Sequence, residues 1–310
     1  MLAPVAELLD AGGDATMPTL VELMNLSAAL TRPDLKPRPT GLTRYPPIHD
    51  YFDVIDTAEK AYCLGFLAGD GWVYPANNAI GLELGAKDVT HLHALRNRMS
   101  PTQPLRQHLC HMNGKEIVQF RLSMHSRPMV EALGRLGVTP AKSRTFVPPV
   151  LTPALQPHFW RGLVDADGSI NHGSTTGWRI ELVGSQAACE GFRAFLVDNG
   201  VATAAKVGRS HGSPRFELGG LTQVKRALTL LGYDDEEALA LPRKAAAARE
   251  VLTTPGRYDH TRRVTPEKVA ALVAAGFDAT EIARALRVGE SSVWKYGRRS
   301  GVRSLRGAVE

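Results

Sequence analysis

The sequence predicts an α+β fold with two similar αββαββα halves and a small all-α domain after them. Three observations lead to this prediction. A short glycine–aspartate motif occurs twice, each copy is followed by the same order of helices and strands, and about sixty residues at the end read as short basic helices. A pattern that recurs at such a distance indicates an internal duplication. We therefore expect a helical appendage or arm at 1–50, halves at 51–147 and 148–252, and a basic linker with a helical domain at 253–310.

The repeated motif reads Gly-x-x-x-(Gly/Ala)-Asp-Gly and covers residues 65–71 and 162–168. Its first and fifth positions are four residues apart, so on a helix they share one face. Small residues at both positions let two helix backbones approach closely. The acid then falls at the C-terminal end of its helix, before a glycine suited to a left-handed backbone conformation. The motif thus predicts two paired helices that end in Asp70 and Asp167.

The placement of these two acids predicts a metal site. A carboxylate at a helix C-terminus faces the negative end of the helix dipole, and two such carboxylates side by side repel each other. A hard divalent cation beside them offsets both penalties, and that arrangement suits metal-assisted hydrolysis of a phosphodiester. The alternative is that each Asp-Gly pair ends an ordinary helix, but two copies in equivalent contexts favour the functional interpretation.

Each copy of the motif opens the same series of predicted elements. The first half is expected to have helices at 57–70, 88–99 and 126–136, and strands at 72–74, 79–86, 104–110 and 116–124. The second half is expected to have helices at 157–167, 186–199 and 221–231, and strands at 169–172, 177–184, 201–209 and 214–219. Thr57 is a plausible N-cap, Asn113-Gly114 is a hairpin signal, and apolar residues alternate with polar ones from Val118 to Met124.

Both motif copies resemble the signature of the LAGLIDADG homing endonucleases, in their two-motif, single-chain form. The second copy, Arg161-Gly-Leu-Val-Asp-Ala-Asp-Gly168, is close to the string that names the family, whereas the first departs from it at Ala68 and Gly69. The resemblance covers about residues 55–250. It implies that the paired motif helices join two pseudo-symmetric αββαββα subdomains into a DNA-binding saddle.

The resemblance also implies a chemistry. The last acid of each motif, Asp70 and Asp167, would bind the Mg²⁺ used to cut DNA, with Gly69 and Ala166 as further metal-binding positions. The cut would be staggered and leave short 3′ overhangs.

Two lysines match a basic residue that this family often places beside the scissile phosphate. Lys142 and Lys244 lie 72 and 77 residues after their aspartates. An ammonium there could stabilise the transition-state charge or help to activate water, and the alternative is an ordinary surface lysine. The family also places a polar residue in a water network, and the sequence does not choose between the matching positions, which are Lys87 or Asp88 and Ser185 or Gln186.

The free face of each sheet is the expected DNA contact, because a β surface fits the major groove. Polar residues that alternate with apolar ones would face that groove, unless they simply face water. The candidates are Glu83, Arg106, His108, Gln119, Arg121, Arg179, Glu181, Lys206, Arg209, Arg215 and Glu217.

Residues 264–299 resemble a helix-turn-helix of the resolvase or sigma-factor type. Thr265 and Pro266 start a helix well, a second short helix is expected at 279–286, and a recognition helix at 290–299. Over 257–310 there are 11 Lys and Arg against 6 Asp and Glu, so most of the net charge of +6 lies here, as phosphate contacts would need. The alternative is a small bundle for protein contacts. The expected DNA-contacting residues are Ser292, Lys295, Arg298 and Arg299.

The composition excludes several other classes. The apolar fraction of 44% is ordinary for a globular protein, and no stretch approaches the length of a membrane span. No signal peptide is recognisable, so we expect a cytoplasmic protein of a bacterial or phage-infected cell, associated with the nucleoid. Three cysteines without paired spacing argue against a disulfide scaffold. A histidine- and cysteine-rich cluster also lacks the paired spacing of a zinc site, and it comprises His91, His93, His108, Cys110 and His111.

The leading hypothesis is a monomeric, Mg²⁺-dependent, site-specific endonuclease for double-stranded DNA, encoded in an intron or between genes. The first alternative is a non-cleaving DNA-binding transcription regulator of the same fold. Such regulators have typically lost the motif acids, and both acids are present here. The second alternative is an RNA maturase with intron RNA as its partner. The sequence shows neither the start nor the His-Asn end of an intact intein.

Overall fold

The structure is a computed structural model that describes residues 44–112, 114–173, 177–255, 264–286 and 288–299. The predicted appendage at 1–50 lies almost wholly outside the described residues, and so does Asn113 of the predicted hairpin. The chain divides into two compact units, 1–253 and 254–310.

The first half of the larger unit has one four-stranded antiparallel sheet in the order β1-β2-β4-β3. Thr57 caps its first helix, since the Thr57 hydroxyl accepts a hydrogen bond from the Lys60 amide at 3.2 Å. The elements are α3 (Ala58–Asp70), β1 (Trp72–Tyr74), η1 (Pro75–Asn77), β2 (Ala79–Gly85), η2 (Ala86–Asp88), α4 (Val89–Met99), β3 (Arg106–Met112), β4 (Lys115–His125), α5 (Arg127–Arg135) and η3 (Lys142–Arg144).

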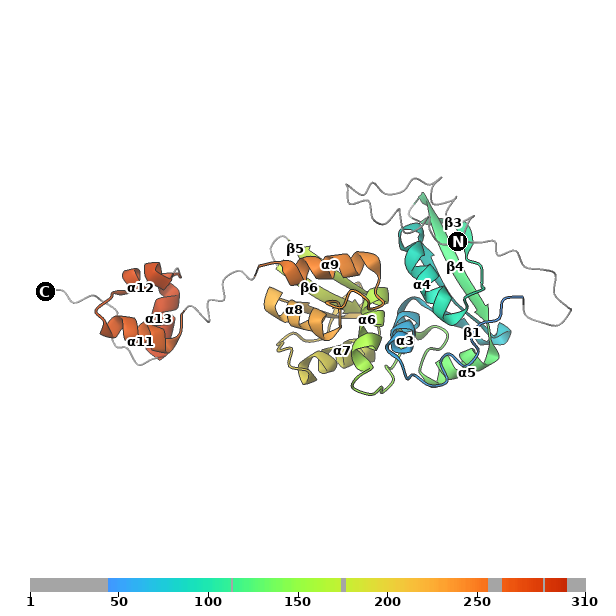
Figure 1. The fold of residues 1–310 in the computed structure, drawn as a ribbon, viewed down its shortest axis with the longest axis horizontal. Coiled ribbons are helices and arrows are strands. Elements are labelled where there is room, and N and C mark those ends of the chain that lie inside the picture. Colours follow the sequence, from blue (N-terminus) through green and yellow to red (C-terminus); the bar gives the residue numbers. More distant parts are fainter. Residues whose placement is uncertain (1–43, 113, 174–176, 256–263, 287, 300–310) are drawn as a thin grey trace. The chain divides into compact units, whose positions relative to one another are not determined.

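The second half repeats this topology, with a sheet in the order β5-β6-β8-β7. Its elements are α6 (Gln156–Asp167), β5 (Gly168–Gly173), β6 (Gly177–Val183), α7 (Gln186–Asp198), β7 (Gly208–Ser210), β8 (Ser213–Gly219), α8 (Leu221–Leu230) and α9 (Pro242–Thr253). The predicted α+β fold with two copies of αββαββα is therefore confirmed. Figure 1 shows α3 and α6 next to each other at the middle of this unit, with one sheet to each side.

Two elements differ from the prediction. The strand expected at 201–209 is reduced to β7, because the main chain before it bonds to side chains instead of a neighbouring strand. The Arg193 guanidinium donates to the carbonyl of Ala205, whose amide donates to the Thr203 hydroxyl. The helix α9 was not expected, because its run of alanines at 245–248 gives little contrast between an apolar and a polar face.

The motif helices α3 and α6 cross where glycine was predicted to permit it. A Cβ added at Gly65 would overlap the carbonyl oxygen of Phe159 and lie 2.9 Å from the Leu163 amide nitrogen. A Cβ added at Gly162 would overlap the Tyr62 carbonyl oxygen in the same way. The backbones thus touch at equivalent points, as the spacing of small residues predicts.

The glycine after each aspartate has a different role from the one predicted. Gly71 has φ −74° and Gly168 has φ −102°, so neither is left-handed. Glycine is required instead because there is no room for a side chain. A Cβ at Gly168 would lie 2.6 Å from the Glu181 carbonyl oxygen, and a Cβ at Gly71 would lie 2.5 Å from the Leu67 carbonyl oxygen. These glycines let the chain pass from the helix end directly into β1 and β5.

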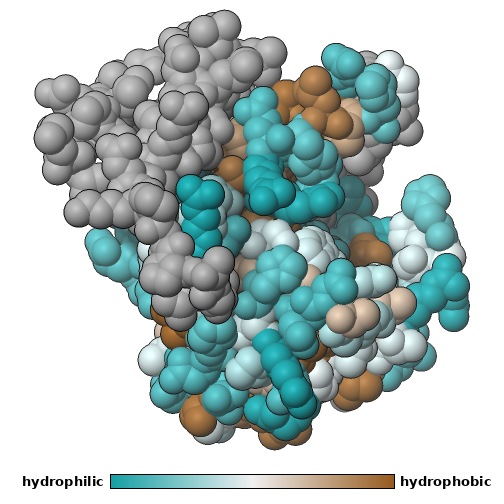
Figure 2. Space-filling model, turned by 90° about the vertical axis from the view of Figure 1, so that its right-hand side faces the viewer, coloured by the Kyte–Doolittle hydropathy of each residue, from teal (hydrophilic) through white to brown (hydrophobic). Residues whose placement is uncertain are grey.

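One hydrophobic core runs through both halves. On β4 the predicted alternation holds, with Phe120, Leu122 and Met124 fully buried and Val118 packed against them. Each sheet therefore covers the core with one face and leaves its polar face free. Figure 2 views this unit from the side of its first half and shows mostly hydrophilic residues with scattered hydrophobic ones.

The smaller unit contains three short helices around a core of its own. Thr265 caps the first helix by accepting from the Lys268 amide at 3.3 Å, as predicted. Val269, Ile282 and Val293 are buried at the centre. The helices are α11 (Pro266–Ala274), α12 (Ala279–Leu286) and α13 (Glu290–Arg299). None of the helices in the described parts of the chain is long and apolar enough to span a bilayer.

Candidate functional site

The two motif aspartates end the crossing helices. Asp70 is the last residue of α3 and Asp167 the last of α6. Asp167 Oδ2 lies 3.1 Å from the position that a Cβ on Gly69 would take, so the carboxyl of one helix lies against the end of the other. Both residues keep a surface open to solvent. The crossing glycines thus bring two accessible carboxyl groups into one place.

The charges at this place perturb both carboxyl groups. Burial raises the pKa of Asp70. Burial and the neighbouring charge of Asp70 together raise the pKa of Asp167 to about 6. Protein atoms surround much of each carboxyl group, and this loss of hydration raises the pKa. Because each residue also has an exposed surface, water reduces the effect. Burial is the larger cause for both acids, and the charge of Asp70 adds to it at Asp167.

Two buried lysines cap the helices that carry these acids. Lys142 Nζ donates to the carbonyl oxygens of Gly69, at 3.1 Å, and Gly71. Lys244 Nζ donates to the carbonyls of Val164, Asp165 and Gly168 at 2.5–2.7 Å. Each ammonium therefore occupies the negative end of the helix dipole of its own half, where a cation is favoured.

The bonding of these lysines limits what they can do. Three carbonyl acceptors use all three N–H groups of Lys244, so this residue acts as a base only after it loses one of these bonds. Burial lowers the pKa of Lys142 and lowers that of Lys244 to about 8. Because each ammonium donates to main-chain carbonyls, these bonds favour the charged form of both lysines, and their role beside a phosphate stays a prediction.

The Gly69 carbonyl, one of the predicted metal-binding positions, is already an acceptor for Lys142. The carboxylates of Asp70 and Asp167 have no hydrogen-bond donor among the described residues and are free to bind a cation.

The sequence did not assign a role to Asp165, the other acid of the second motif. Asp165 is fully buried and accepts hydrogen bonds from the hydroxyls of Tyr62 and Tyr233, both at 2.6 Å, and from the Leu241 amide at 2.7 Å. It ties α6 to α3 and to the segment that leads into α9. One feature of the sequence could have revealed this role: the second motif copy has a carboxylate at the helix position where the first copy has Ala68.

A buried arginine on the same helix performs a related structural task. Arg161 donates to the carbonyls of Leu231 and Leu239, and its guanidinium lies 5.6 Å from the centre of the Tyr62 ring. It replaces Leu64 of the first copy. The second motif helix thus carries two buried polar anchors that the first one lacks.

At the start of α4 and of α7, the two alternative positions for the polar residue of the water network differ in burial and bonding. Asp88 is buried and its carboxylate accepts from Arg243, whereas Lys87 is exposed. Ser185 is buried and caps α7, whereas Gln186 is exposed and bonds to a neighbour on its own helix.

The predicted DNA-contacting residues of the first half share the free face of its sheet. Arg106, Arg121 and Glu83 lie opposite one another on three adjacent strands, and His108 lies opposite Gln119. Glu83 pairs with Arg121 at 2.6 Å and with His108 at 2.8 Å. The basic side chains are therefore held in place by a carboxylate of the same face.

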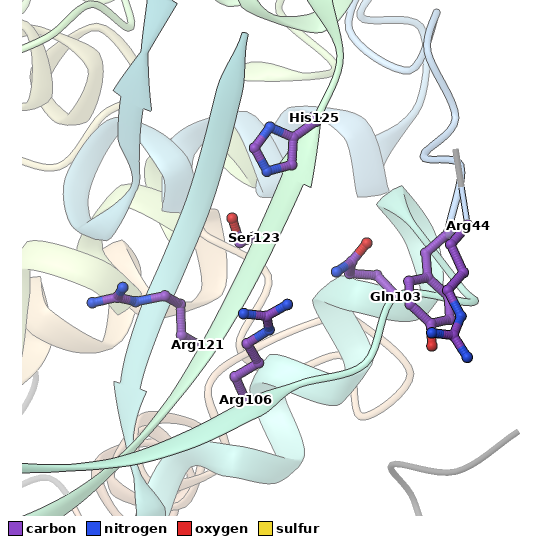
Figure 3. Close-up of a pocket in the computed structure, with 7 residues that line it drawn as sticks. Arg44, Gln103, Arg106, Arg121, Ser123 and His125 are labelled. Atoms are coloured by element: carbon purple, nitrogen blue, oxygen red, sulfur yellow. The ribbon is translucent and has the colours of Figure 1, made fainter. Parts of the chain in front are cut away.

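One end of this face is a hollow of about 450 Å³ with a basic lining. Figure 3 shows Arg106 and Arg121 on neighbouring strands, with Gln103 and Arg44 at the opposite rim and His125 at the far end of β4. The sequence did not assign Arg44, which comes from the segment before the first motif.

The free face of the second sheet has a similar network. Arg179 bonds to Asn171 and approaches Glu217 at 3.5 Å, and Arg215 pairs with Glu181 at 3.0 Å and with Glu217. The remaining two predicted contacts lie outside this network. Arg209 is on the short β7 and bonds to the turn carbonyl of Gly212, and Lys206 precedes that strand.

In the smaller unit the predicted contacts lie on α13. Lys295, Arg298 and Arg299 are exposed and Ser292 is partly buried. The Arg299 guanidinium lies 5.6 Å from the centre of the Tyr296 ring. The unit thus presents a basic helix surface, and DNA binding by it stays a prediction.

The histidines and the cysteine of the suspected zinc cluster lie on α4 and β3. Among the described residues, no group of three or more His, Cys, Asp or Glu is placed to hold a metal ion. His91 bonds to the Tyr62 hydroxyl at 3.0 Å, and burial lowers its pKa to about 3, so it is a neutral core residue.

No protein-family model matches the chain, and no curated protein matches it. Similar solved structures include full-length DUF199/WhiA from Thermatoga maritima, with 15% identity and a TM-score of 0.41 over 81% of this chain and 94% of that chain. The homing endonuclease I-WcaI bound to its DNA recognition sequence has 10% identity and a TM-score of 0.45, over 68% and 94%. The LAGLIDADG meganuclease I-AabMI bound to uncleaved DNA has 14% identity and a TM-score of 0.37, over 77% and 97%. The structural neighbours are thus LAGLIDADG endonucleases and WhiA, and the likeness is one of fold.

Proposed function

We propose that this chain is a site-specific DNA endonuclease that hydrolyses both strands of a duplex with a divalent metal. The observation that carries the proposal is the pair of aspartates at the ends of two crossing helices. Asp167 is held beside Asp70 although the charge of Asp70 raises its pKa. Such an arrangement is unfavourable in the metal-free protein because the carboxylates are close together. A cation bound to both carboxylates would make the same arrangement favourable.

The residues present fit a hard cation such as Mg²⁺. Their free donors are carboxylate oxygens, and Mg²⁺ is commonly held by one or two carboxylates together with water and substrate phosphates. Asp70 and Asp167 would hold it. Once bound, such an ion lowers the pKa of water and neutralises developing charge on a phosphate.

The chain's own residues supply the remaining requirements. Lys142 and Lys244 keep fixed positive charge beneath the acids, which favours the approach of a phosphate anion. The basic side chains on the two sheet faces and on α13 would bind the DNA backbone and base edges, as proposed for each of them from the sequence.

The test is a cleavage assay with the full chain. Duplexes selected from a randomised library for binding in Ca²⁺, and DNA spanning the uninterrupted gene locus, are incubated with Mg²⁺ and then with EDTA. We expect a staggered double-strand cut in Mg²⁺ alone, and no cut by the Asp70→Asn/Asp167→Asn variant. Absence of cleavage by the unaltered chain, or unchanged cleavage by the double variant, would refute the proposal.

One observation favours a second candidate, a DNA-binding regulator that does not cleave. The helix ends beneath the acids are already satisfied by the two lysine ammonium groups, so the fold closes without a metal. A regulator would bind the selected duplex with the same affinity in Mg²⁺ and in EDTA, and the duplex would stay intact.

A further inference from the structure

An ion pair between the two halves lies beside the site of Asp70. Arg243 is the second residue of α9, and its Nε donates to both carboxylate oxygens of Asp88, at 3.1 and 3.2 Å. The next residue, Lys244, has its ammonium at the end of α6. The same helix that places the lysine thus also places the guanidinium where its charge acts on Asp70.

This guanidinium keeps most of its donors free. The Asp88 side chain is 8% exposed, whereas that of Arg243 is 48% exposed. The hydrogen bonds to Asp88 come from Nε only, and within the described residues neither terminal nitrogen of Arg243 has an acceptor. Four N–H groups in a planar fork thus remain for an anion, which is the geometry that suits a phosphate.

The other half of the molecule has no such pair. The residue before Lys142 is Ala141, where the residue before Lys244 is Arg243. The position of Asp88, directly before α4, is taken in the second half by Ser185, directly before α7. Ser185 caps its helix through the Ala188 amide and donates to the Phe146 carbonyl. The two halves are alike in fold and unlike in charge at this point.

The electrostatic surroundings of the two acids reflect this difference. The positive charges of Lys244, Lys142 and Arg243 all lower the pKa of Asp70, whereas among positive charges it is the two lysines that lower the pKa of Asp167. The guanidinium thus acts more strongly on Asp70 than on Asp167.

We propose that Arg243, oriented by Asp88, contacts the scissile phosphate of the strand that Asp70 serves, so that this strand is cut first. The proposal rests on the proposed endonuclease function. It adds a catalytic contact, Arg243, and a positioning residue, Asp88, and it makes the two cuts sequential with a nicked duplex as intermediate.

The experiment follows both strands of one selected duplex, each with its own end label, during cleavage by the full chain in Mg²⁺. We expect the unaltered chain to cut one strand faster. Arg243→Ala should slow that strand by about 10- to 100-fold, the loss expected for a charge-assisted hydrogen bond, and should leave the other strand unchanged. Asp88→Asn should slow cleavage of the same strand by a smaller factor, because the uncharged amide can still orient the guanidinium.

Two further variants separate chemistry from folding. Removal of Arg243 alone leaves a buried carboxylate unpaired, which destabilises the chain. The double variant Arg243→Gln/Asp88→Asn retains an amide–amide contact without buried charge and should show the same strand-selective loss at full thermal stability. Arg249→Ala removes an exposed charge from another face of α9 and should change neither strand.

The outcomes decide between the two claims. Equal cutting of the strands by the unaltered chain, or an equal loss on both strands in Arg243→Ala and in the double variant, overturns the strand preference and leaves the endonuclease standing. No cleavage of either strand by the unaltered chain overturns the endonuclease, and the strand preference with it.

Discussion

Gly65→Ala is the substitution that most directly tests how the site is assembled. Gly65 lies where α3 crosses α6, and an added methyl group would overlap the Phe159 carbonyl and lie 2.9 Å from the Leu163 amide nitrogen. Both are main-chain atoms, which cannot rotate aside as a side chain does. The helices must therefore move apart, and the aspartates at their ends move with them.

The size of the effect follows from two opposing terms. Alanine is preferred over glycine inside a helix by about 1 kcal/mol. Overpacking of a close-packed interface costs typically about 1–3 kcal/mol, and more where nothing can yield. At this crossing the second term is at its upper end, about 3 kcal/mol, so we expect a net loss of about 2 kcal/mol in the free energy of unfolding. For a unit of this size that lowers the Tm by roughly 4–8 °C.

The assay is urea unfolding of the full chain followed by circular dichroism, with Gly134→Ala as the matched control. Gly134 is also helical, in α5, and a Cβ there would have no neighbour within 4 Å. The control should therefore gain about 0.5–1 kcal/mol from helix propensity. If Gly65→Ala were as stable as the unaltered chain, or gained as much as Gly134→Ala, the close approach of the two backbones would be disproved.

Three further predictions concern charge. Because the pKa of Asp167 is raised to about 6 from 3.8, the metal-free chain should lose about 1 kcal/mol of stability, after solvent screening, as the pH rises from 4 to 7, and unfolding of Asp167→Asn in EDTA should lack this loss. Lys244→Met removes a hydrogen-bond donor from three carbonyls at the end of α6 and should cost about 3 kcal/mol, against no change for the exposed Lys87→Met. Equal midpoints in urea would contradict this. Arg121→Ala should reduce the slope of log affinity against log salt concentration for duplex DNA by about 1, as expected for one lost phosphate contact. Arg135→Ala should leave the slope unchanged. Equal slopes for the two variants would show that Arg121 does not contact DNA.

Local patterns predicted most of the fold. The helix crossing follows from small residues four positions apart, a relation contained in seven residues of sequence. The strands of both sheets follow from alternation over a few residues, as on β4. The exception at 201–207 arose because Arg193, on the preceding helix, supplies a hydrogen-bond donor to that main chain. A tertiary contact of this kind leaves no mark on the strand's own sequence.

The parts of the site that were missed depend on distant pairs. Arg243 and Asp88 are 155 residues apart; the sequence offered Asp88 as one of two candidates for a polar residue and gave Arg243 no role. Asp165 stood out as a departure from the first motif, but its partners Tyr233 and Leu241 follow it by 68 and 76 residues. A single sequence shows which residues differ between two repeats, whereas the structure shows what each difference touches.

The lysines revise the reason why the acids are tolerated at helix ends. From the sequence, each carboxylate was expected to be disfavoured by the helix dipole until a metal bound. In the structure, an ammonium group already binds the terminal carbonyls of each motif helix, so the dipole is compensated from beneath. What remains uncompensated is the burial of the Asp167 carboxyl together with the neighbouring charge of Asp70, and both raise the pKa of Asp167. On the proposed function, a divalent cation would serve the pair of acids and neither helix alone. On this reasoning, the Asp70→Asn variant should lower the pKa of Asp167, because the neighbouring charge is gone, and should weaken divalent-metal binding at the same time. Titration of Asp167 by NMR in EDTA would measure the first effect, and an unchanged pKa would show that burial alone sets it.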